Sequence, residues 1–468
     1  GLTCVILILL WIRAETGYDR FHDDHERIYR VNNIMKTPNR DMNMGGINAP
    51  GGPEFKANFP VIEDYVRYRL TYSDIKYADQ FYRVNMVYAD SNFFRMLNFP
   101  LESGDRTTCL SAPDKVVLSR STATKIFGSD DPVNKVIEIS NKPFVVSAVA
   151  GDPPLNSSIG FDGVIQLSVL EQQSHVSWDG GLQCQTFLKL VPGADPQALL
   201  ADIKEYLYGA INERFLKSGF EIVPYLQPIK EMHLSSETEF DTIDKGSVKR
   251  IISFAFVGLL ILMTACFNFV NISTALSMKR SKEVSIRKIY GSGRKRLVVL
   301  FISESGLSIL FAIIFALLLS KTLLHSFNGL IGSELNFSIF AVHEWIILSI
   351  ILWIVCVFLA SFYSAWYLSA IPPMSILRKV SGGKGRQLSR NILVTFQFAL
   401  SISLIISCLV MYSQMQYTGK IDKGFSDDNV IFLGLSGTAS KRSVIIKERL
   451  EAVPGIVSVT QSAGGMPG

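Results

Sequence analysis

The sequence predicts an α-helical transmembrane bundle with a large α+β domain inserted on its outer side. Two observations predict this class. Apolar residues make up 48% of the 468-residue chain and are concentrated in a few long blocks, which is typical of membrane spans and unlike a large soluble enzyme. Residues 279–296 lie between two such blocks and hold eight basic side chains and one acidic one. Because basic loops beside spans stay in the cytoplasm, this loop sets the orientation of the chain.

The chain opens with apolar residues 2–12, which look like the second half of a membrane span. As a helix they cover about 18 Å of a hydrocarbon core that is roughly 30 Å thick. No basic region precedes them and no small-residue cleavage site follows, so a signal peptide is not expected. We therefore expect residues 1–13 to be the end of a truncated first span, and the chain to be a fragment.

Residues 14–247 predict one mixed α+β domain. Short runs that alternate between apolar and polar residues predict strands, namely Val84–Tyr88, Lys115–Leu118, Val136–Ile139, Phe144–Val149, Thr186–Leu190 and Phe220–Tyr225. Two segments between them predict helices. Residues 119–127 begin with a serine cap, and 196–216 place their leucines and isoleucines on one face.

Four further spans are predicted from the remaining apolar blocks. The loop 325–344 contains no Lys or Arg and is expected outside, whereas 279–296 and 372–391 are basic and expected inside. The two basic loops agree, so the large domain faces outward. The predicted divisions are the end of the first span (1–13), the outside domain (14–247), the spans 248–278, 297–324, 345–371 and 392–415, the inside segments 279–296 and 372–391, the outside loop 325–344, and the start of a second outside domain (416–468).

The tail of the chain repeats the opening of the outside domain. The matching pairs are Phe21-His-Asp-Asp24 with Phe425-Ser-Asp-Asp428, Ile28–Val31 with Val430–Leu433, and Phe59-Pro60-Val-Ile62 with Val453-Pro454-Gly-Ile456. Each pair follows a span in the same order. This arrangement indicates an internal duplication, with the second copy incomplete in this chain.

Several chemistries have no motif in the sequence. It contains no G-x-x-x-x-G-K-[ST], so any nucleotide energy is expected to come from another polypeptide. H-E-x-x-H, G-x-S-x-G and the cysteine spacing of zinc sites do not occur either. The net charge of +5 is concentrated beside spans, where topology and anionic lipid explain it without nucleic acid. We expect no catalytic residue, metal or cofactor in this chain, and no nucleic-acid partner.

The six cysteines fall into two groups. Cys4, Cys266, Cys356 and Cys408 lie in apolar blocks, where we expect small buried hydrophobic residues. Cys109 and Cys184 lie in the outside domain and could pair in an oxidising compartment, although their spacing does not require it.

The segment His22-Asp23-Asp24-His25-Glu26 contains carboxylates and imidazoles, which are the side chains that bind metals. A solvated turn just beyond the membrane, with acids near a helix start, is the simpler interpretation.

Asn268, Asn271 and Glu304 are polar residues inside predicted spans. A carboxylate in a membrane is costly, so by default it has a functional role or a partner. Glu304 lies at a shallow depth, which favours pairing with Arg294 or Lys295 over a role in proton or ion transport. The spans carry no paired acids along a path, which gives little support for an ion-driven transporter.

Motifs along nearly the whole chain match one known family. In the outside domain they are Tyr18-Asp-Arg-Phe-His22, Arg27-Ile-Tyr-Arg-Val31, Phe59-Pro-Val-Ile-Glu63, Tyr88-Ala-Asp-Ser-Asn-Phe-Phe94, Val117-Leu-Ser119, Ala123, Ile126-Phe-Gly128, Asp152-Pro-Pro154 and Asn156-Ser157. In the membrane part they are Asn268-Phe-Val-Asn271, Ala275, Lys282-Glu-Val-Ser-Ile-Arg-Lys288, Gly291 and Ser303-Glu304. With these motifs the chain resembles ABC transporter permeases of the MacB/FtsX type, in the tandem form with two periplasmic domains and eight spans. Ser285 and Asn134 stand where this family would have glycine.

The resemblance implies a MacB-like periplasmic core domain of porter and Sabre parts, a multi-pass inner-membrane location, and a mechanism called mechanotransmission. In this mechanism a separate cytoplasmic ABC ATPase dimer, which holds the ATP and Mg²⁺, docks on the permease and moves its spans. The outside domains then export a substrate that is already in the periplasm. The resemblance also allows a periplasmic adaptor and an outer-membrane channel as partners, and membrane lipid surrounds the spans.

By the same resemblance, 279–296 is a coupling helix that docks on the ATPase. Its candidate docking residues are Lys279, Arg280, Lys282, Glu283, Arg287, Lys288, Gly291 and Arg294, and a second cytoplasmic contact comprises Pro373, Ile376, Leu377 and Arg378. Helical spacing of the apolar residues supports a helix here. Alternatively, the loop only fixes topology and lies on anionic headgroups. The alternative function is an FtsX-like signalling or scaffold protein that regulates a periplasmic partner without transport.

Overall fold

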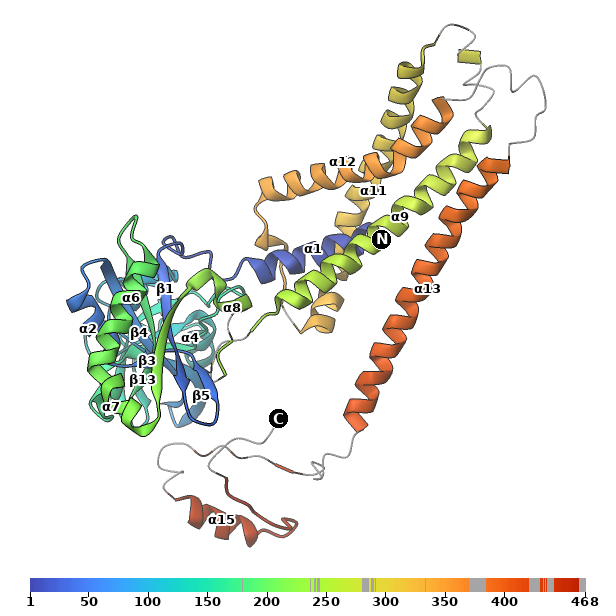
Figure 1. The fold of residues 1–468 in the computed structure, drawn as a ribbon. Helices are drawn as coiled ribbons and strands as arrows, with labels where there is room; N and C mark the ends of the chain where they lie inside the picture. The colour runs from blue at the N-terminus through green and yellow to red at the C-terminus, as the bar shows by residue number, and fades with distance from the viewer. Residues whose placement is uncertain are drawn as a thin grey trace. The chain divides into compact units, whose positions relative to one another are not determined.

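The computed structural model describes residues 1–178, 180–235, 237–239, 241, 245–279, 286, 287, 290, 292–332, 334–369, 384–420, 430, 431, 433, 435 and 442–462. The chain divides into two compact units (Figure 1). The membrane unit comprises Gly1–Thr16 and Ser247–Ser426, and the outside unit comprises Gly17–Gly246 and Asp427–Gly468. A helical unit with an inserted mixed α/β unit confirms the predicted fold class.

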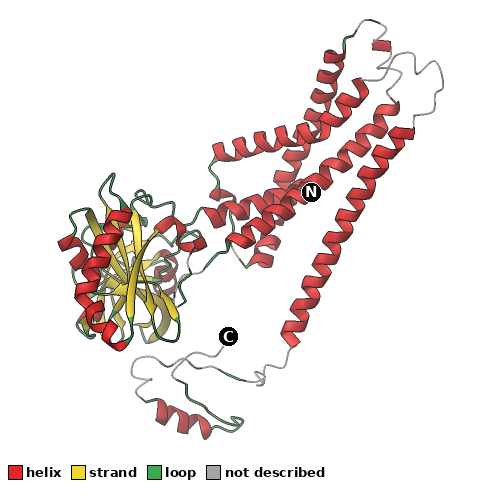
Figure 2. Cartoon of the chain, viewed as in Figure 1, coloured by secondary structure: helices red, strands yellow, loops and turns green. Residues whose placement is uncertain are grey.

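The outside unit is built on a sheet, drawn yellow in Figure 2. The sheet is mixed, and its strand order is β14-β1-β13-β4-β5-β10-β7-β9-β6. In the described part of the chain the strands are β1 (Ile28–Lys36), β2 (Asp41–Met44), β3 (Ile47–Asn48), β4 (Ile62–Tyr77), β5 (Gln80–Ala89), β6 (Leu101–Ser103), β7 (Lys115–Ser119), β8 (Val136–Ile139), β9 (Lys142–Ala150), β10 (Gly163–Gln166), β11 (Val176–Ser177), β12 (Gly180–Gly181), β13 (Gln183–Leu190) and β14 (Glu221–Pro228). The six predicted runs all fall within strands, to within one residue.

Two hairpins of this sheet use the same tight turn. Ala78 and Asp79 join β4 to β5, and Ser140 and Asn141 join β8 to β9, all four with positive φ between 45° and 63°. Two consecutive left-handed residues match the right-handed twist of the flanking strands. The turns therefore hold the long β4–β5 ribbon in register without glycine.

The helices of the outside unit are α2 (Gly51–Asn58), α3 (Phe93–Met96), α4 (Arg120–Phe127), α5 (Ser168–Glu171), α6 (Pro196–Leu207), α7 (Glu213–Phe215), α8 (Met232–Ser235) and α15 (Ser443–Glu451). The serine cap of α4 is confirmed, because the Ser119 hydroxyl accepts the Thr122 N–H. The predicted helix 196–216 is confirmed, because helical structure runs without a break from Pro196 to Ser218. It changes to a π turn at Tyr208–Asn212, where the Asn212 amide bonds both the N–H and the C=O of Ile222 at 2.8 Å.

The core of the outside unit lies on both faces of the sheet. On one side, α2 and α6 bury Phe55, Leu199 and Ile203 against β1, β13 and β14. Another cluster surrounds the aromatic rings of α3, which pack on β4, β5 and β13. The regular burial of α6 follows from apolar residues at helical spacing, as the sequence predicted.

The membrane unit consists of long helices. They are α1 (Leu2–Thr16), α9 (Val248–Lys279), α11 (Arg294–Ile331), α12 (Val342–Ser369) and α13 (Lys384–Lys420). Of these, α9, α11, α12 and α13 are long and apolar enough to cross a membrane. Helix α11 continues beyond residue 324, the expected end of the span, and ends where Gly332 takes a left-handed conformation with φ 65°. Helix α13 begins within the predicted inside segment 372–391.

The cysteines lie in different surroundings from those expected. Cys266 and Cys356 are buried between helices as predicted, but Cys4 and Cys408 are exposed, because the helix faces that carry them meet no other part of the unit. In a bilayer such faces contact lipid. Cys109 and Cys184 are both free thiols in separate core clusters, so they do not pair.

The tail has one local similarity to the start of the outside domain. Helix α15 is followed by a turn in which the Ile456 N–H donates to the Val453 carbonyl at 3.2 Å. Helix α2 is followed by the same turn, in which the Ile62 N–H donates to the Phe59 carbonyl at 3.0 Å. This similarity supports the duplication, which stays a prediction. The motif 425–428 lies outside the described residues.

Arg67 on β4 joins three segments inside the outside unit. Its guanidinium donates to both carboxylate oxygens of Asp90 (2.7 and 3.0 Å), to Glu171 (2.8 Å) and to the Ala49 carbonyl (2.8 Å). We predict that Arg67→Met lowers the free energy of unfolding by about 3 kcal/mol, because it removes a buried cation and leaves two partly buried carboxylates without it. Denaturant unfolding followed by Trp178 fluorescence measures this loss. The control Arg95→Met removes an exposed pair with Asp64 and should cost less than about 1 kcal/mol; equal losses would contradict the prediction.

Candidate functional site

The structure describes only part of the predicted docking loop. Lys279 is the last residue of α9, Arg294 is the first of α11, and Arg287 lies exposed in a short helical segment. In that segment the Tyr290 N–H donates to the Ile286 carbonyl at 3.0 Å, which is one turn of helix. The remaining docking candidates, Arg280, Lys282, Glu283, Lys288 and Gly291, and the second contact, Pro373, Ile376, Leu377 and Arg378, lie outside the described residues.

Two apolar side chains of this loop are exposed. Ile286 and Tyr290 are 53% and 86% exposed, although both belong to the apolar face that the sequence predicts for a helix. Exposed apolar groups beside basic ones are typical of a surface that a partner or a membrane covers.

The three intramembrane polar candidates have different surroundings. The Asn271 amide on α9 donates to the Gln397 side chain on α13 at 3.2 Å. Phe267 and Phe396 meet edge to face beside this pair, with ring centroids 6.1 Å apart. Asn268 is exposed, and so is Glu304 on α11. Of the three, Asn271 therefore joins two spans, whereas the predicted pairing of Glu304 with Arg294 or Lys295 stays a prediction.

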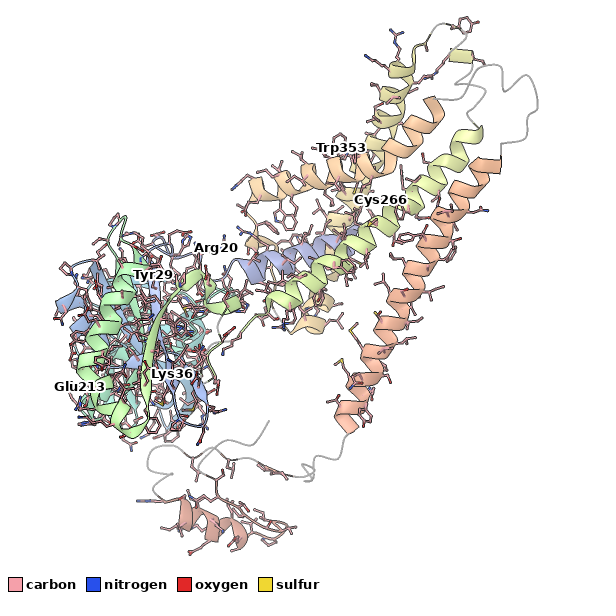
Figure 3. All side chains as sticks on the ribbon, in the orientation of Figure 1. Arg20, Tyr29, Lys36, Glu213, Cys266 and Trp353 are labelled. Carbon is pink, nitrogen blue, oxygen red and sulfur yellow. The ribbon has the colours of Figure 1, made fainter. Side chains whose placement is uncertain are left out.

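Helices α11 and α12 are held close by one small residue. The Trp353 indole N–H on α12 donates to the Gly306 carbonyl on α11 at 2.7 Å. A Cβ atom at Gly306 would lie 2.9 Å from the indole ring, so only glycine permits this approach. Figure 3 shows Trp353, and also Cys266 on α9, among the packed helices of the membrane unit. The two helices thus pack closely at a small residue, as transmembrane helices commonly do.

The outer end of α1 is bonded to the start of α12. The Arg13 guanidinium donates to Glu344 at 2.9 Å and lies over the Phe340 ring, 5.9 Å from its centroid. Glu344 also accepts the Ala341 N–H at 2.9 Å, which caps the first turn of α12. We call Arg13, Phe340, Ala341 and Glu344 the outer joint. It links the first helix of the chain to the hairpin formed by α11 and α12.

Both ends of the outside domain are fixed by one group of residues. The Asn156 amide donates to the Gly17 carbonyl at 2.8 Å, one residue after α1 ends. The Tyr18 ring stacks on the His233 ring, with centroids 3.5 Å apart, and the Gly246 N–H donates to the His233 carbonyl at 2.8 Å. We call Gly17, Tyr18, Asn156, His233 and Gly246 the tether clamp. It joins the segment that enters the domain to the segment that leaves it.

A buried ion pair fixes the exit segment further. Arg30 on β1 bonds Asp241 at 2.7 Å, and both side chains are fully buried. Arg30 also donates to Gln227 on β14 at 2.9 Å. Removing one partner of a buried pair costs several kcal/mol, about 3–5 in measured cases, so the exit segment is held firmly to the sheet.

The segment 22–26 forms a turn whose side chains have different surroundings. The described residues include no group of three His, Cys, Asp or Glu side chains that could hold a metal ion. The predicted turn is present, but it is not fully solvated: His22 is buried, and burial together with the nearby His25 lowers its pKa to about 3. His22 therefore stays neutral and accepts the Asn98 N–H at 3.3 Å.

Sequence reasoning did not identify the outer joint or the tether clamp. Tyr18 and Asn156 belong to the quoted family motifs, but Arg13, His233 and Glu344 were not singled out as sites. Their partners lie up to 331 residues away in the chain, so no local pattern could have revealed the contacts.

Comparison with known proteins adds two family matches. The family model for the MacB-like periplasmic core domain matches residues 1–206, and the model for the FtsX-like permease C-terminal region matches residues 255–373. No curated protein matches the chain.

Three of the solved structures that are similar to this chain are domains or regions of larger proteins. A domain from a Porphyromonas gingivalis protein described as a permease is 20% identical, covers 50% of this chain and 98% of its own, and has a TM-score of 0.42. The periplasmic region of MacB from Actinobacillus actinomycetemcomitans is 13% identical over 43% of this chain and 90% of its own, with a TM-score of 0.33. The extracellular domain of the noncanonic ABC-type transporter YknZ from Gram-positive bacteria is 10% identical over 43% and 99%, with a TM-score of 0.32.

We predict that Arg13 and Glu344 are energetically coupled. Arg13→Glu and Glu344→Arg should each destabilise the membrane unit, whereas the double exchange should recover about 0.2–1 kcal/mol, the usual strength of a half-exposed pair. Unfolding of the four proteins in mixed lipid–detergent micelles gives the coupling energy. A coupling energy of zero would mean that the outer joint is not a stabilising contact.

We also predict that Asn271 holds α13 to α9. Asn271→Ala should remove about 0.6–1.7 kcal/mol from the contact, the range measured for hydrogen bonds between spans. The readout is the rate at which Phe267→Cys and Phe396→Cys form a disulfide in a protein without its other cysteines, and this rate should fall. The control Asn268→Ala changes an exposed neighbour and should leave the rate unchanged.

Proposed function

Because the chain belongs to the MacB/FtsX family of ABC transporter permeases, we propose that it couples ATP hydrolysis by a separate cytoplasmic ATPase to movement of its periplasmic domain. The family places such a chain in the inner membrane, with its MacB-like domain in the periplasm. In the proposal, the chain does not itself hydrolyse nucleotide, and the ATPase dimer holds the ATP and Mg²⁺. The moving domain exports a substrate from the periplasm.

The observation that carries the proposal is the tether clamp. Helix α1 ends at Thr16, and the next residue, Gly17, already belongs to the clamp. Helix α9 begins at Val248, two residues after Gly246 of the clamp. A flexible linker would absorb a displacement of either helix, whereas connections this short transmit it. Two helices that are each joined to the clamp by so short a connection can therefore act on the domain together.

Contacts within the membrane unit could carry a displacement from the basic loop to α1 and α9. Helices α9 and α11 flank the basic loop, α11 is fitted to α12 through Gly306 and Trp353, and α12 is bonded to α1 through the outer joint. In this proposal, a push on the loop reaches the tether clamp both directly along α9 and through α11, α12 and α1. The exposed Ile286 and Tyr290 and the basic residues beside them would form the surface on which the ATPase docks.

Export would also need partners outside the inner membrane. A periplasmic adaptor and an outer-membrane channel belong to the proposal on the family resemblance alone. Co-purification of the full chain with envelope proteins tests for them, and recovery of a cell-wall hydrolase instead would favour the signalling function.

We predict that reversing charge in the basic loop uncouples the ATPase. The double variant Arg287→Glu, Lys288→Glu should weaken ATPase binding at least about tenfold, because opposed charges at an interface become like charges. Co-purification and ATP hydrolysis in nanodiscs measure this. The matched control is Lys249→Glu, an exposed charge at the opposite end of α9, which should leave binding unchanged. Normal binding and hydrolysis by the double variant would overturn the docking role.

A further inference from the structure

Asp19, the neighbour of Tyr18 in the tether clamp, combines three unusual features. Its side chain is completely buried. Its backbone has a left-handed φ of 56°, which is uncommon for any residue except glycine, asparagine and aspartate. Its Oδ2 atom has no hydrogen-bond donor among the described residues. Strained and unsatisfied groups of this kind concentrate at functional sites.

The other atoms of Asp19 hold the clamp segments together. Oδ1 accepts the Ser158 N–H at 2.8 Å, and the Asp19 N–H donates to the Asn156 carbonyl at 2.8 Å. Asn156 in turn bonds Gly17. The Asp19 carboxyl group thus contacts the loop Asn156–Ser158, and the same loop bonds Gly17 of the entry segment.

The positive charges around Asp19 do not fully compensate the cost of ionising its buried carboxyl group. Arg30 on β1 and His233 on α8 lie near enough to favour its ionised form, and Tyr68 on β4 is the other titratable group beside it. Arg30 is already paired with Asp241 at 2.7 Å. Arg30 therefore bonds Asp241 directly and acts on Asp19 only through its charge, so burial outweighs it at Asp19.

We propose that Asp19 is a proton-binding site that sets how firmly the tether clamp closes. With the proton bound, Oδ2 is part of a neutral carboxyl group, whose burial costs much less free energy than the burial of a charged one. When the proton leaves, a charge is created in a buried place where one oxygen has no donor, and the clamp opens more easily to let water reach it.

The direction of the titration agrees with this geometry. Burial raises the pKa of Asp19 from its ordinary value of 3.8 to about 6, against the opposing effects of Ser158, His233 and Arg30. The closed clamp therefore binds the proton more tightly than the open one. Its extra stability is complete below about pH 4 and is lost as the pH rises through 6. The domain faces the periplasm, where acid conditions would stiffen the clamp and neutral conditions would loosen it.

A regulatory role for this site in a permease rests on the proposed function. The proton dependence of the clamp itself does not rest on it. The test is hydrogen exchange of the Asp19 and Ser158 amides in the full chain, in nanodiscs without any ATPase, corrected for intrinsic exchange rates. Between pH 4.5 and 7.5 the opening constant of the wild type should rise roughly 25-fold, as the two pKa values require.

The matched variant is Asp19→Asn, which keeps the oxygen that Ser158 bonds and tolerates the left-handed backbone. Its opening constant should not vary with pH in this range. Asp23→Asn, an exposed acid in the same segment, should keep the wild-type response. If Asp19→Asn does not fold, Asp19→Gly permits the same φ and should show the same flat profile.

A flat wild-type profile would overturn the inference, and would mean that an ordered water keeps Asp19 ionised throughout. An unchanged slope in the Asp19 variants would overturn it as well. The loop variant Arg287→Glu, Lys288→Glu should retain the full proton response. Loss of ATPase coupling in that variant would therefore test the proposed function separately from the proton site.

Discussion

The outside domain is inserted between two helices, so the chain enters and leaves it at two points, and both points are fastened to His233. The ring of this residue stacks on Tyr18 of the entry segment, and its carbonyl accepts the N–H of Gly246 in the exit segment. A relative displacement of α1 and α9 at their outer ends must therefore either move the domain as a body or separate the stacked rings and the hydrogen bond. The behaviour of the domain depends on which of these costs less.

The interior of the domain resists separation of its parts. Arg30 and Arg67 each bond carboxylates from distant segments, and each is almost completely buried. Buried ion pairs add little net stability compared with apolar packing, but separating one leaves a charge in a place of low polarity. Such pairs resist partial opening more than they raise overall stability. The most easily altered part is then Asp19, where one carboxyl oxygen has no donor in the part of the chain that the structure describes.

The helices of the membrane unit are joined by a few polar contacts among many apolar ones. Helix α1 packs against α9 and α11 and is bonded to α12 at its outer end. Helix α13 meets α9 through Asn271 and Phe267, and large side chains along its outer half, such as Met411 and Met415, are exposed. Since lipid is as apolar as these side chains, such contacts and close packing decide which helices move together.

Hydropathy determined the membrane class and the division into a helical part and a mixed α/β domain, and charge predicted the orientation, because these depend on composition along the chain and not on contacts. Alternation and capping also located six strands and α4. The sixteen-residue strand β4 was not predicted, because charged and polar residues interrupt its alternation. Only its pairing with β13 and β5 makes it a strand.

The tertiary structure alone decided the outer joint, the tether clamp and the surroundings of Asp19. Arg13 and Glu344 are separated by 331 positions, and Asp19 and Ser158 by 139. No periodicity extends over such distances. In the sequence, Asp19 is an ordinary polar residue after a span. It becomes buried only because segments from four parts of the chain pack around it. Local sequence sets what each segment can form, whereas the environment of a charge depends on what the rest of the chain brings to it.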